Sequence, residues 1–177
     1  MLSKTWADPP WEEIFMTAIP AIAFAAYSGT GKTTLIEKLV RLFKSRGYRV
    51  AVIKHDGHRF QVDKEGKDSW RFTQAGADIT VISSQEQTAF MEHRPLSLDA
   101  LLGMVHDVDL ILVEGYKNQN LPQIGIARQA TGKGFPAELS RYVAIVTDME
   151  VDAPVPRFGL EDIEPLADFI RNRMGLA

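Results

Sequence analysis

Residues 26–34 read Ala-Tyr-Ser-Gly-Thr-Gly-Lys-Thr-Thr, and this stretch decides the fold. The apolar run 19–25 precedes it, and the helix-like stretch 35–44 follows it. A loop between a strand and a helix points successive backbone N–H groups and the helix N-terminus at one place, which stabilises concentrated negative charge there. Lys32 can reach the β and γ phosphates of a nucleotide, and the Thr33 hydroxyl can bind Mg²⁺. The stretch therefore predicts a phosphate-binding loop for a nucleoside triphosphate.

The first position of the motif departs from the strict pattern, which begins with Gly where this chain has Ala26. Ala is tolerated there if the residue does not need a positive φ angle. A simpler alternative is a glycine-rich turn that only links a strand to a helix. The Gly-Lys-Thr-Thr core and the periodicity of the flanking segments agree with each other, so we favour the phosphate-binding interpretation.

The composition indicates a single globular domain. With 177 residues, 45% hydrophobic content and nine Phe, the chain can bury a sizeable core. We expect one nucleotide-binding domain over residues 16–177, after a loose N-terminal extension over residues 1–15. Cys is absent, which excludes disulfides, thiolate zinc sites and cysteine nucleophiles and favours a reducing compartment.

Charge and hydropathy argue against nucleic acid and membranes as partners. The formal net charge of −3 does not suit a chain built to bind polyanions. No apolar run approaches the roughly 20 residues that span a bilayer. The N-terminus also lacks a basic region followed by an apolar core. We therefore expect a soluble, cytoplasmic protein.

Strand-like and helix-like segments alternate along the chain, which predicts an α/β fold with a doubly wound, mostly parallel sheet flanked by helices, as in P-loop NTPases. The run 21–25 is expected to be a central strand, and 124–127 an edge strand. Further strands are expected at 48–53, 77–83, 110–113 and 142–146, and helices at 35–44, 69–74, 97–105 and 161–174. Such sheets bind ligands at the carboxyl ends of their strands.

Two carboxylates follow predicted strands and are candidate partners of Mg²⁺. Glu114 ends the apolar strand 110–113, the position from which P-loop proteins complete the Mg²⁺ shell. Asp56 follows the strand 48–53 and is the best second carboxylate. Asp109 begins its strand and is expected at the opposite end of the sheet, as a solvated turn residue.

Two further clusters have both a functional and an ordinary interpretation. A transition metal bound by His55, Asp56 and His58 is an alternative, although no additional His or Cys cluster completes a shell. Lys67 or Arg71 is a candidate clamp for a second phosphate-bearing group, whereas the ordinary alternative is a solvated loop that ends in a helix cap.

Asp148 follows the predicted strand 142–146 and is a candidate for base recognition. A carboxylate there would accept hydrogen bonds from N1–H and the exocyclic amino group of guanine, whereas adenine presents an N1 acceptor that would face it with lone pairs. This role would select GTP over ATP. Asp after a strand is also a common turn residue, so that alternative stays open.

Five motifs in a fixed order resemble the molybdopterin-guanine dinucleotide biosynthesis protein B (MobB) family. The resemblance extends from about residue 18 to the C-terminal helix, and the second, third and fifth motifs are much more specific than the phosphate loop. In chain order, the five motifs read Phe-Ala-Ala-Tyr-Ser-Gly-Thr-Gly-Lys-Thr-Thr (24–34), Ile-Lys-His-Asp-Gly-His (53–58), Asp-Lys-Glu-Gly-Lys-Asp-Ser (63–69), Ala-Gly-Ala (75–77) and Leu-Ile-Leu-Val-Glu-Gly-Tyr-Lys (110–117).

The resemblance implies a dimeric adaptor that binds GTP with Mg²⁺, hydrolyses it weakly, and assists the guanylyltransferase that joins GMP to molybdopterin. Molybdopterin or its guanine dinucleotide is a further candidate ligand. By position, Glu114 would bind the metal-linked water, while Lys32 and Thr33 would serve phosphate and Mg²⁺. The residues carried over as the nucleotide-binding loop are Ser28, Gly29, Thr30, Gly31, Lys32, Thr33 and Thr34.

Slow hydrolysis is also expected from the residues themselves. An arginine finger contributes roughly 10³ to 10⁵ in rate, and a residue that orients the attacking water is needed as well. Neither is identifiable here, although Arg59, Arg71 and Arg128 are candidates for the arginine. The alternative function is a small-molecule kinase that uses ATP, with Asp56 as its base and residues 57–71 as a lid.

Overall fold

The computed structural model describes residues 19–57, 60–116 and 120–177. The chain divides into two compact units, of which the larger contains the described residues up to His55 together with Leu98–Ala177, and the smaller contains residues 56–97. The predicted extension over residues 1–15 lies outside the described residues. The assignment of 16–177 to one domain stays a prediction.

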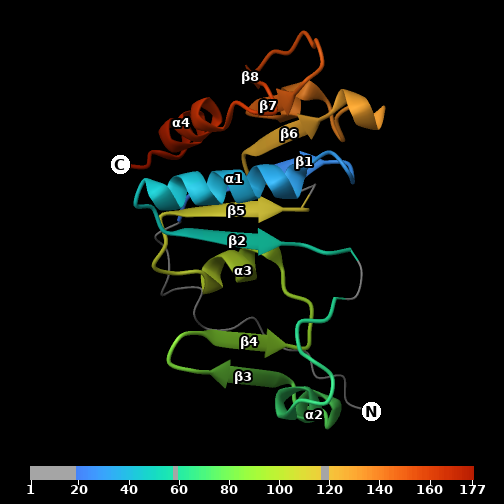
Figure 1. Ribbon diagram of the computed structural model, residues 1–177, viewed down its shortest axis with the longest axis vertical. Helices are drawn as coiled ribbons and strands as arrows, with labels where there is room; N and C mark the ends of the chain where they lie inside the picture. The colour runs from blue at the N-terminus through green and yellow to red at the C-terminus, as the bar shows by residue number, and fades with distance from the viewer. Residues whose placement is uncertain (1–18, 58–59, 117–119) are drawn as a thin grey trace. The chain divides into compact units, whose positions relative to one another are not determined.

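The larger unit is built on a six-stranded sheet in the order β2-β5-β1-β6-β7-β8, in which every neighbouring pair is parallel (Figure 1). The central strand is β1, as the sequence predicts, because a short apolar run suits a strand buried on both faces. The strands are β1 (Ala21–Ala26), β2 (Val50–Lys54), β5 (Leu110–Glu114), β6 (Gln123–Ala127), β7 (Ala144–Thr147) and β8 (Arg157–Phe158).

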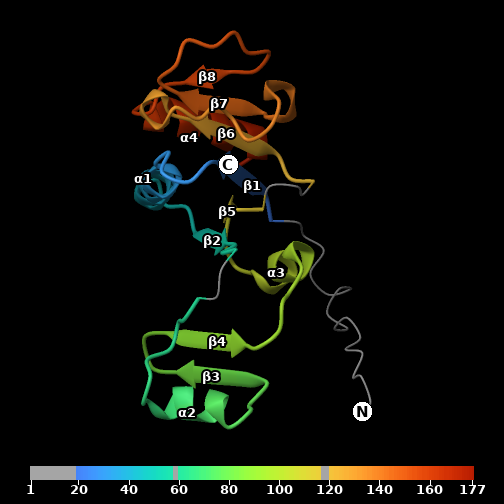
Figure 2. The same ribbon diagram turned by 90° about the vertical axis from the view of Figure 1, so that its right-hand side faces the viewer.

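Helices cover both faces of this sheet (Figure 2). On one face, α1 (Lys32–Ser45) and α4 (Ile163–Met174) enclose the main core, which contains the buried side chains of Phe24, Leu39 and Ile170. On the other face, α3 (Leu98–Met104) places Leu98 against Ile111 and Val113. The predicted α/β fold with a parallel sheet flanked by helices is therefore confirmed.

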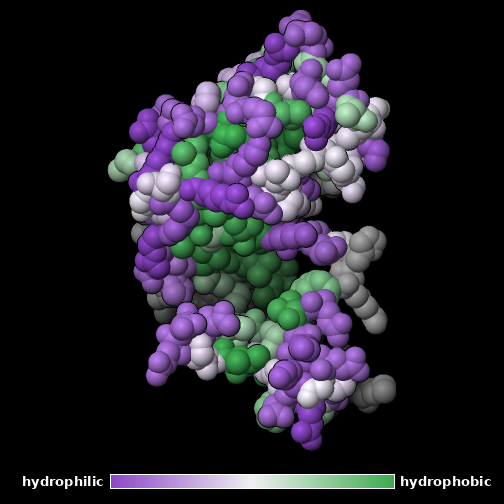
Figure 3. Space-filling view, viewed as in Figure 1, coloured by the Kyte–Doolittle hydropathy of each residue, from purple (hydrophilic) through white to green (hydrophobic). Residues whose placement is uncertain are grey.

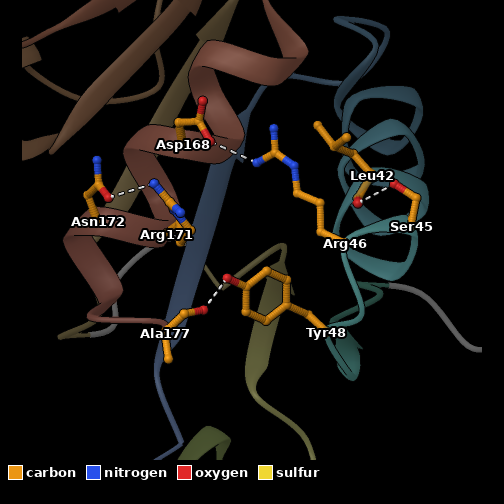
Figure 4. Close-up of polar contacts among 8 residues, drawn as sticks. All are labelled: Leu42, Ser45, Arg46, Tyr48, Asp168, Arg171, Asn172 and Ala177. Atoms are coloured by element: carbon orange, nitrogen blue, oxygen red, sulfur yellow. Dashed lines mark hydrogen bonds and ion pairs between the residues drawn. The ribbon is translucent and has the colours of Figure 1, made fainter.

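Polar contacts join the chain after α1 to the middle of α4 and to the C-terminal residue (Figure 4). Arg46 Nη1 donates to Asp168 Oδ1 at 2.8 Å, and the Tyr48 hydroxyl donates to the carbonyl oxygen of Ala177. Exposed ion pairs contribute at most about 1 kcal/mol, so the apolar core beneath them carries most of the stability of this helix pair.

A third apolar cluster lies on the α3 face of the sheet, where the Tyr142 ring packs directly over Gly125 of β6. The Tyr142 hydroxyl accepts a hydrogen bond from the backbone N–H of Ala137 at 2.9 Å. Burial raises the pKa of Tyr142 above its ordinary value, so the phenol stays neutral near pH 7. Two 3₁₀ turns, Gln129–Thr131 and Leu139–Arg141, complete the connection between β6 and β7.

The smaller unit contains α2 (Asp68–Gln74) and an antiparallel hairpin of β3 (Ile79–Ser83) and β4 (Thr88–Glu92). The turn between the two strands is closed by Ser84, whose N–H donates to the carbonyl of Gln87 at 2.9 Å. Several large apolar side chains of this unit are exposed, among them Val81 and Phe90, which face each other across the hairpin.

The structure corrects two strand assignments. The segment 77–83 forms a strand at 79–83, but it pairs with β4 and not with the parallel sheet, because the polar turn after Ser83 returns the chain at once. The segment 124–127 is an interior strand and not an edge strand, because β7 and β8 extend the sheet beyond it. The sequence analysis missed β4 and the two-residue β8.

The described part of the chain has no helix that is both long and apolar enough to cross a bilayer. The helices at 35–44, 69–74, 97–105 and 161–174 are all present, with shifts at their ends.

Substitution of Gly125 by Ala should lower the free energy of unfolding by about 1–3 kcal/mol, because overpacking displaces a rigid neighbour. A Cβ atom at this position would lie 2.7 Å from the Tyr142 ring. Chemical denaturation followed by circular dichroism measures the change. Gly134→Ala is the matched control, because its Cβ would meet nothing within 4 Å. Equal unfolding free energies for the two variants would contradict the packing described here.

Candidate functional site

The phosphate-binding loop connects the buried end of β1 to the first turn of α1. Gly29 and Gly31 have φ angles of 85° and 88°, a region in which residues with a Cβ atom are strained. Ala26 is the last residue of β1 and does not have a positive φ, so the departure from the strict motif imposes no strain. Thr30 is buried, and its hydroxyl donates to the carbonyl of Tyr27 at 2.9 Å, which holds the turn.

The first turn of α1 presents backbone N–H groups without a competing acid on the helix itself. Gly31 occupies the N-cap position, no side chain caps the helix, and the first turn contains no acidic residue. Uncapped N–H groups and the helix dipole together favour an anion at this point. The first turn of α1 therefore suits an anion, and the phosphate-binding role stays a prediction.

Glu114 brings a carboxylate to this loop from the neighbouring strand. The β1–β5 register pairs Phe24 with Glu114, so the last residue of β5 lies beside the start of the loop. Its Oε1 accepts a hydrogen bond from the Thr33 hydroxyl at 3.2 Å and lies 3.4 Å from Lys32 Nζ. The Glu114 side chain is buried, and a buried carboxylate needs polar partners such as these two.

The residues around Glu114 fit a magnesium ion. A hydroxyl and a carboxylate are the hard oxygen ligands that Mg²⁺ takes, often with several retained waters. Two oxygens that share an octahedral shell lie about 2.9 Å apart, and those of Thr33 and Glu114 are 3.2 Å apart. These residues could therefore hold the ion directly or through its water, with Lys32 left for phosphate.

The carboxyl ends of β2 and β5 are packed tightly beside this carboxylate. The N–H of His55 donates to the Glu114 carbonyl at 2.8 Å, and the His55 ring packs against that of Tyr116 at a tilt of 39°, with centroids 4.7 Å apart. Gly115 has φ 99°, and a Cβ there would lie 2.7 Å from the His55 carbonyl oxygen. Burial raises the pKa of Tyr116 above its ordinary value, which keeps the phenol neutral near pH 7.

Asp148 lies at the carboxyl end of β7, as the sequence predicts, and has a structural partner there. Its Oδ1 accepts a hydrogen bond from the backbone N–H of Gln129 at 2.7 Å, which links the segment after β7 to the segment after β6. The side chain is exposed. Its role in base recognition stays a prediction.

A cavity of about 100 Å³ lies next to the phosphate loop, on the side of β6 and β7. The sequence analysis named the phosphate loop and Arg128 but missed the other walls. None of the motifs in the sequence includes Lys38, Leu160 or Glu161. The cavity is lined by Thr30, Gly31, Thr34, Leu35, Lys38, Ile126, Arg128, Val146, Leu160 and Glu161.

Residues 21–148 match the family described as "Molybdopterin guanine dinucleotide synthesis protein B", MobB. The chain belongs to the MobB family. The matched segment contains the phosphate loop, Glu114 and Asp148, although the cavity extends beyond it to Glu161.

Two bacterial relatives are similar to this chain over most of their length, and both are named molybdopterin-guanine dinucleotide biosynthesis adapter protein. The one from Haemophilus influenzae is 42% identical over 165 residues, covering 90% of this chain and 92% of the relative. The one from Escherichia coli is 40% identical over 163 residues, covering 87% and 93%. The family is therefore one of adapter proteins of this biosynthesis.

Solved MobB structures have the same fold. The crystal structure of Bacillus subtilis MobB aligns with a TM-score of 0.72 at 23% identity and covers 88% of this chain and 98% of that one. The MobB homologue from Bacillus stearothermophilus aligns with a TM-score of 0.65 at 25% identity, covering 89% and 99%. At such identities the likeness supports the architecture and does not assign residue roles.

Several predicted site residues belong to the smaller unit or lie outside the described residues. Asp56, Lys67 and Arg71 belong to the smaller unit, so their predicted roles stay predictions. Arg71 Nη1 lies 3.5 Å from Asp68 Oδ1 on its own helix. His58, the third ligand of the alternative metal site, lies outside the described residues, within which no group of three His, Cys, Asp or Glu suits a metal ion.

The variant Glu114→Gln should raise the Mg²⁺ concentration needed for nucleotide binding by about 10- to 100-fold, as loss of an outer-shell carboxylate typically does. Titration of Mg²⁺ at fixed concentrations of protein and fluorescent GTP analogue measures this. Asp109→Asn is the matched control, because Asp109 precedes the opposite end of β5, where its carboxylate accepts from the Arg49 N–H. An unchanged Mg²⁺ requirement in Glu114→Gln would assign the metal to other residues.

Proposed function

We propose that this protein binds GTP with Mg²⁺, hydrolyses it slowly, and acts as an adapter for the guanylyltransferase that joins GMP to molybdopterin. The observation that carries the nucleotide part is the convergence of Lys32, Thr33 and Glu114, with contacts of 3.4 Å and 3.2 Å at the carboxyl end of β5. An ammonium, a hydroxyl and a carboxylate at one helix N-terminus are what a Mg²⁺-bound triphosphate needs.

Each residue of the phosphate loop has a defined role in this proposal. The backbone N–H groups from Gly29 to Thr34 hold the phosphates, and Lys32 leaves its contact with Glu114 to reach the β and γ oxygens. Glu114 would hold a water molecule of the Mg²⁺ shell. Mg²⁺, when bound, supplies the Lewis acid that neutralises charge on the phosphates. In this proposal, Lys32 and Thr33 give up their contacts with the Glu114 carboxylate when the nucleotide and Mg²⁺ bind.

Slow turnover is proposed because the loop supplies binding groups and little else. Within the described residues, the polar contacts of Thr30, Lys32 and Thr33 go to Tyr27 and Glu114, and neither is a Gln or His that would orient a water against the γ phosphate. An arginine finger would add roughly 10³ to 10⁵ in rate, and within the described part of the chain no Arg bonds to Lys32 or Thr33. A slow GTPase suits an adapter better than a metabolic enzyme.

The adapter role rests on the family. The relatives that align over about nine-tenths of this chain are named adapter proteins of molybdopterin-guanine dinucleotide biosynthesis. That dinucleotide contains GMP, so a protein that holds guanine nucleotide beside the transferase is a chemically direct helper. Molybdopterin or its guanine dinucleotide is a further ligand of this proposal, and no membrane or nucleic acid is part of it.

The test of the nucleotide proposal is calorimetric titration with Mg·GTP and Mg·ATP, followed by a phosphate-release assay on the same sample. GTP should bind more tightly, and phosphate should be released without an added acceptor at well below the roughly 1–100 s⁻¹ typical of kinases. Preference for ATP, with phosphate transferred to a metabolite and none released to water, would favour a small-molecule kinase and contradict the proposal.

Lys32→Ala should weaken Mg·GTP binding by at least about tenfold, because a charge-assisted hydrogen bond contributes about 1.5–3 kcal/mol. Lys44→Ala is the matched control, since Lys44 is exposed in the last turn of the same helix. Both variants should retain the circular dichroism spectrum of the parent. Equal affinity for Mg·GTP in the parent and a folded Lys32→Ala variant would remove the phosphate-loop assignment.

We also propose a homodimer that forms through the hairpin of the smaller unit. Figure 3 shows apolar side chains at the molecular surface, and on this hairpin Val81 is 55% exposed and Phe90 50% exposed. Exposed apolar patches on soluble proteins often mark interfaces. Sedimentation velocity should give a dimer for the parent and a monomer for Val81→Lys. Glu86→Lys, in the hairpin turn, is the control and should stay dimeric, whereas a monomeric parent would contradict the proposal.

A further inference from the structure

The cavity beside the phosphate loop has the position and the chemistry of a base-binding pocket, an inference that rests on the proposed nucleotide function. One wall is formed by Thr30 and Thr34, which belong to the loop and to the first turn of α1. The opposite wall is formed by Ile126 and Val146, near the carboxyl ends of β6 and β7. The cavity is therefore continuous with the predicted phosphate site.

The sheet order gives the direction in which a bound triphosphate would extend. The metal end of the site lies toward β5, where Glu114 contacts Lys32 and Thr33. The cavity lies on the other side of β1, because β6 and β7 follow β1 in the sheet. A triphosphate whose γ end is held at Glu114 thus carries its nucleoside toward the cavity, past Thr34.

The wall opposite the phosphate loop is apolar. Ile126 and Val146 are almost fully buried there, and the partly buried Leu160 adds a further aliphatic side chain. Binding pockets for small molecules are mostly apolar, with a few polar groups that fix orientation, and complete pockets measure about 300–1,000 Å³. The volume of about 100 Å³ suits one end of a nucleotide, so the flat base is the part that enters.

Charged groups from separate elements stand at the cavity. Lys38 of α1 donates to Glu161 at 2.6 Å, and both residues line the cavity. Arg128, after β6, adds a second cation, which suits the phosphate-bearing side of a nucleotide. The Glu161 side chain is 81% exposed, so its carboxylate is held by the lysine and not by burial.

This pair of charges is complementary to the edge of guanine. Guanine presents the O6 acceptor beside two donors, N1–H and the exocyclic amino group, whereas adenine presents an acceptor at N1. Lys38 can donate to O6 while Glu161 accepts from both donors. Adenine would place the N1 lone pair toward the carboxylate or lose one of the three contacts.

We propose that the cavity binds the guanine base and that Glu161, with Lys38, recognises its edge. Asp148, the carboxylate that the sequence suggested for this role, does not line the cavity, and its Oδ1 already accepts from the Gln129 N–H at 2.7 Å. Glu161 is therefore the specificity-determining residue, and Asp148 positions the segment after β6.

The experiment is a change of base preference in the variant Glu161→Gln. Xanthine carries a C2 carbonyl where guanine has the amino group, so the introduced side-chain amide would accept from N1–H and donate to that carbonyl. Calorimetry should show Mg·GTP binding weakened by at least about tenfold and Mg·XTP binding strengthened, so that the preference reverses. The Lys38–Glu161 pair is exposed, and exposed ion pairs contribute little to stability, so the variant should fold.

Asp148→Asn is the matched control, because it makes the same chemical change in a carboxylate outside the cavity. It should keep the preference of the parent for Mg·GTP over Mg·XTP. If Asp148→Asn reverses the preference and Glu161→Gln does not, Asp148 recognises the base and the inference is overturned. The same conclusion follows if neither variant changes the ratio of the two affinities.

Magnesium tripolyphosphate separates this inference from the nucleotide proposal, because it carries the phosphates without a base. The parent should bind it more weakly than Mg·GTP, and Glu161→Gln should bind it as well as the parent or slightly better, since a negative charge is removed. A parent that binds Mg·tripolyphosphate and Mg·GTP equally would overturn the base pocket and leave the phosphate site intact. A parent that binds neither would overturn both.

Discussion

The parallel register between β1 and β5 is the constraint on which the rest of the site depends. Because Phe24 pairs with Glu114, the buried carboxylate at the end of β5 meets the ammonium and the hydroxyl that α1 presents at its first turn. A shift of one residue would turn this carboxylate to the opposite face of the sheet. The apolar runs that fix the register are thus as important to the site as the charged residues themselves.

Much of the larger unit can be predicted from sequence, because its signals are local. Gly29 and Gly31 indicate the conformation of the phosphate loop, because both adopt positive φ angles. A strand that ends in Glu114 places this residue at the edge of the parallel sheet where the loop also lies. Residues 79–83 were assigned to the wrong sheet because their sequence suits a strand of a parallel or an antiparallel sheet equally well. Only the turn at Ser84 decides that the strand pairs with β4. The two-residue β8 is too short to carry a periodic pattern.

The cavity was beyond sequence analysis for a different reason. Its walls come from α1, from the ends of β6 and β7 and from the segment before α4, which are far apart along the chain. Lys38 and Glu161 become partners only when α1 and the start of α4 lie side by side, and neither carries a motif. Asp148 had the motif-like position but is engaged by Gln129. Strand-end rules thus locate an edge of the sheet and do not rank the residues along it.

The contact between Gly125 and Tyr142 has a consequence for the cavity, although it lies on the opposite face of the sheet. Gly125 precedes Ile126 in β6, and Tyr142 leads into β7, the two strands whose ends form the cavity wall. Because Gly125 has no Cβ, the Tyr142 ring packs directly against β6 on the face of the sheet opposite the cavity. The strands that form the wall therefore rest against an aromatic ring outside the cavity, and a larger residue at position 125 would have to displace that ring.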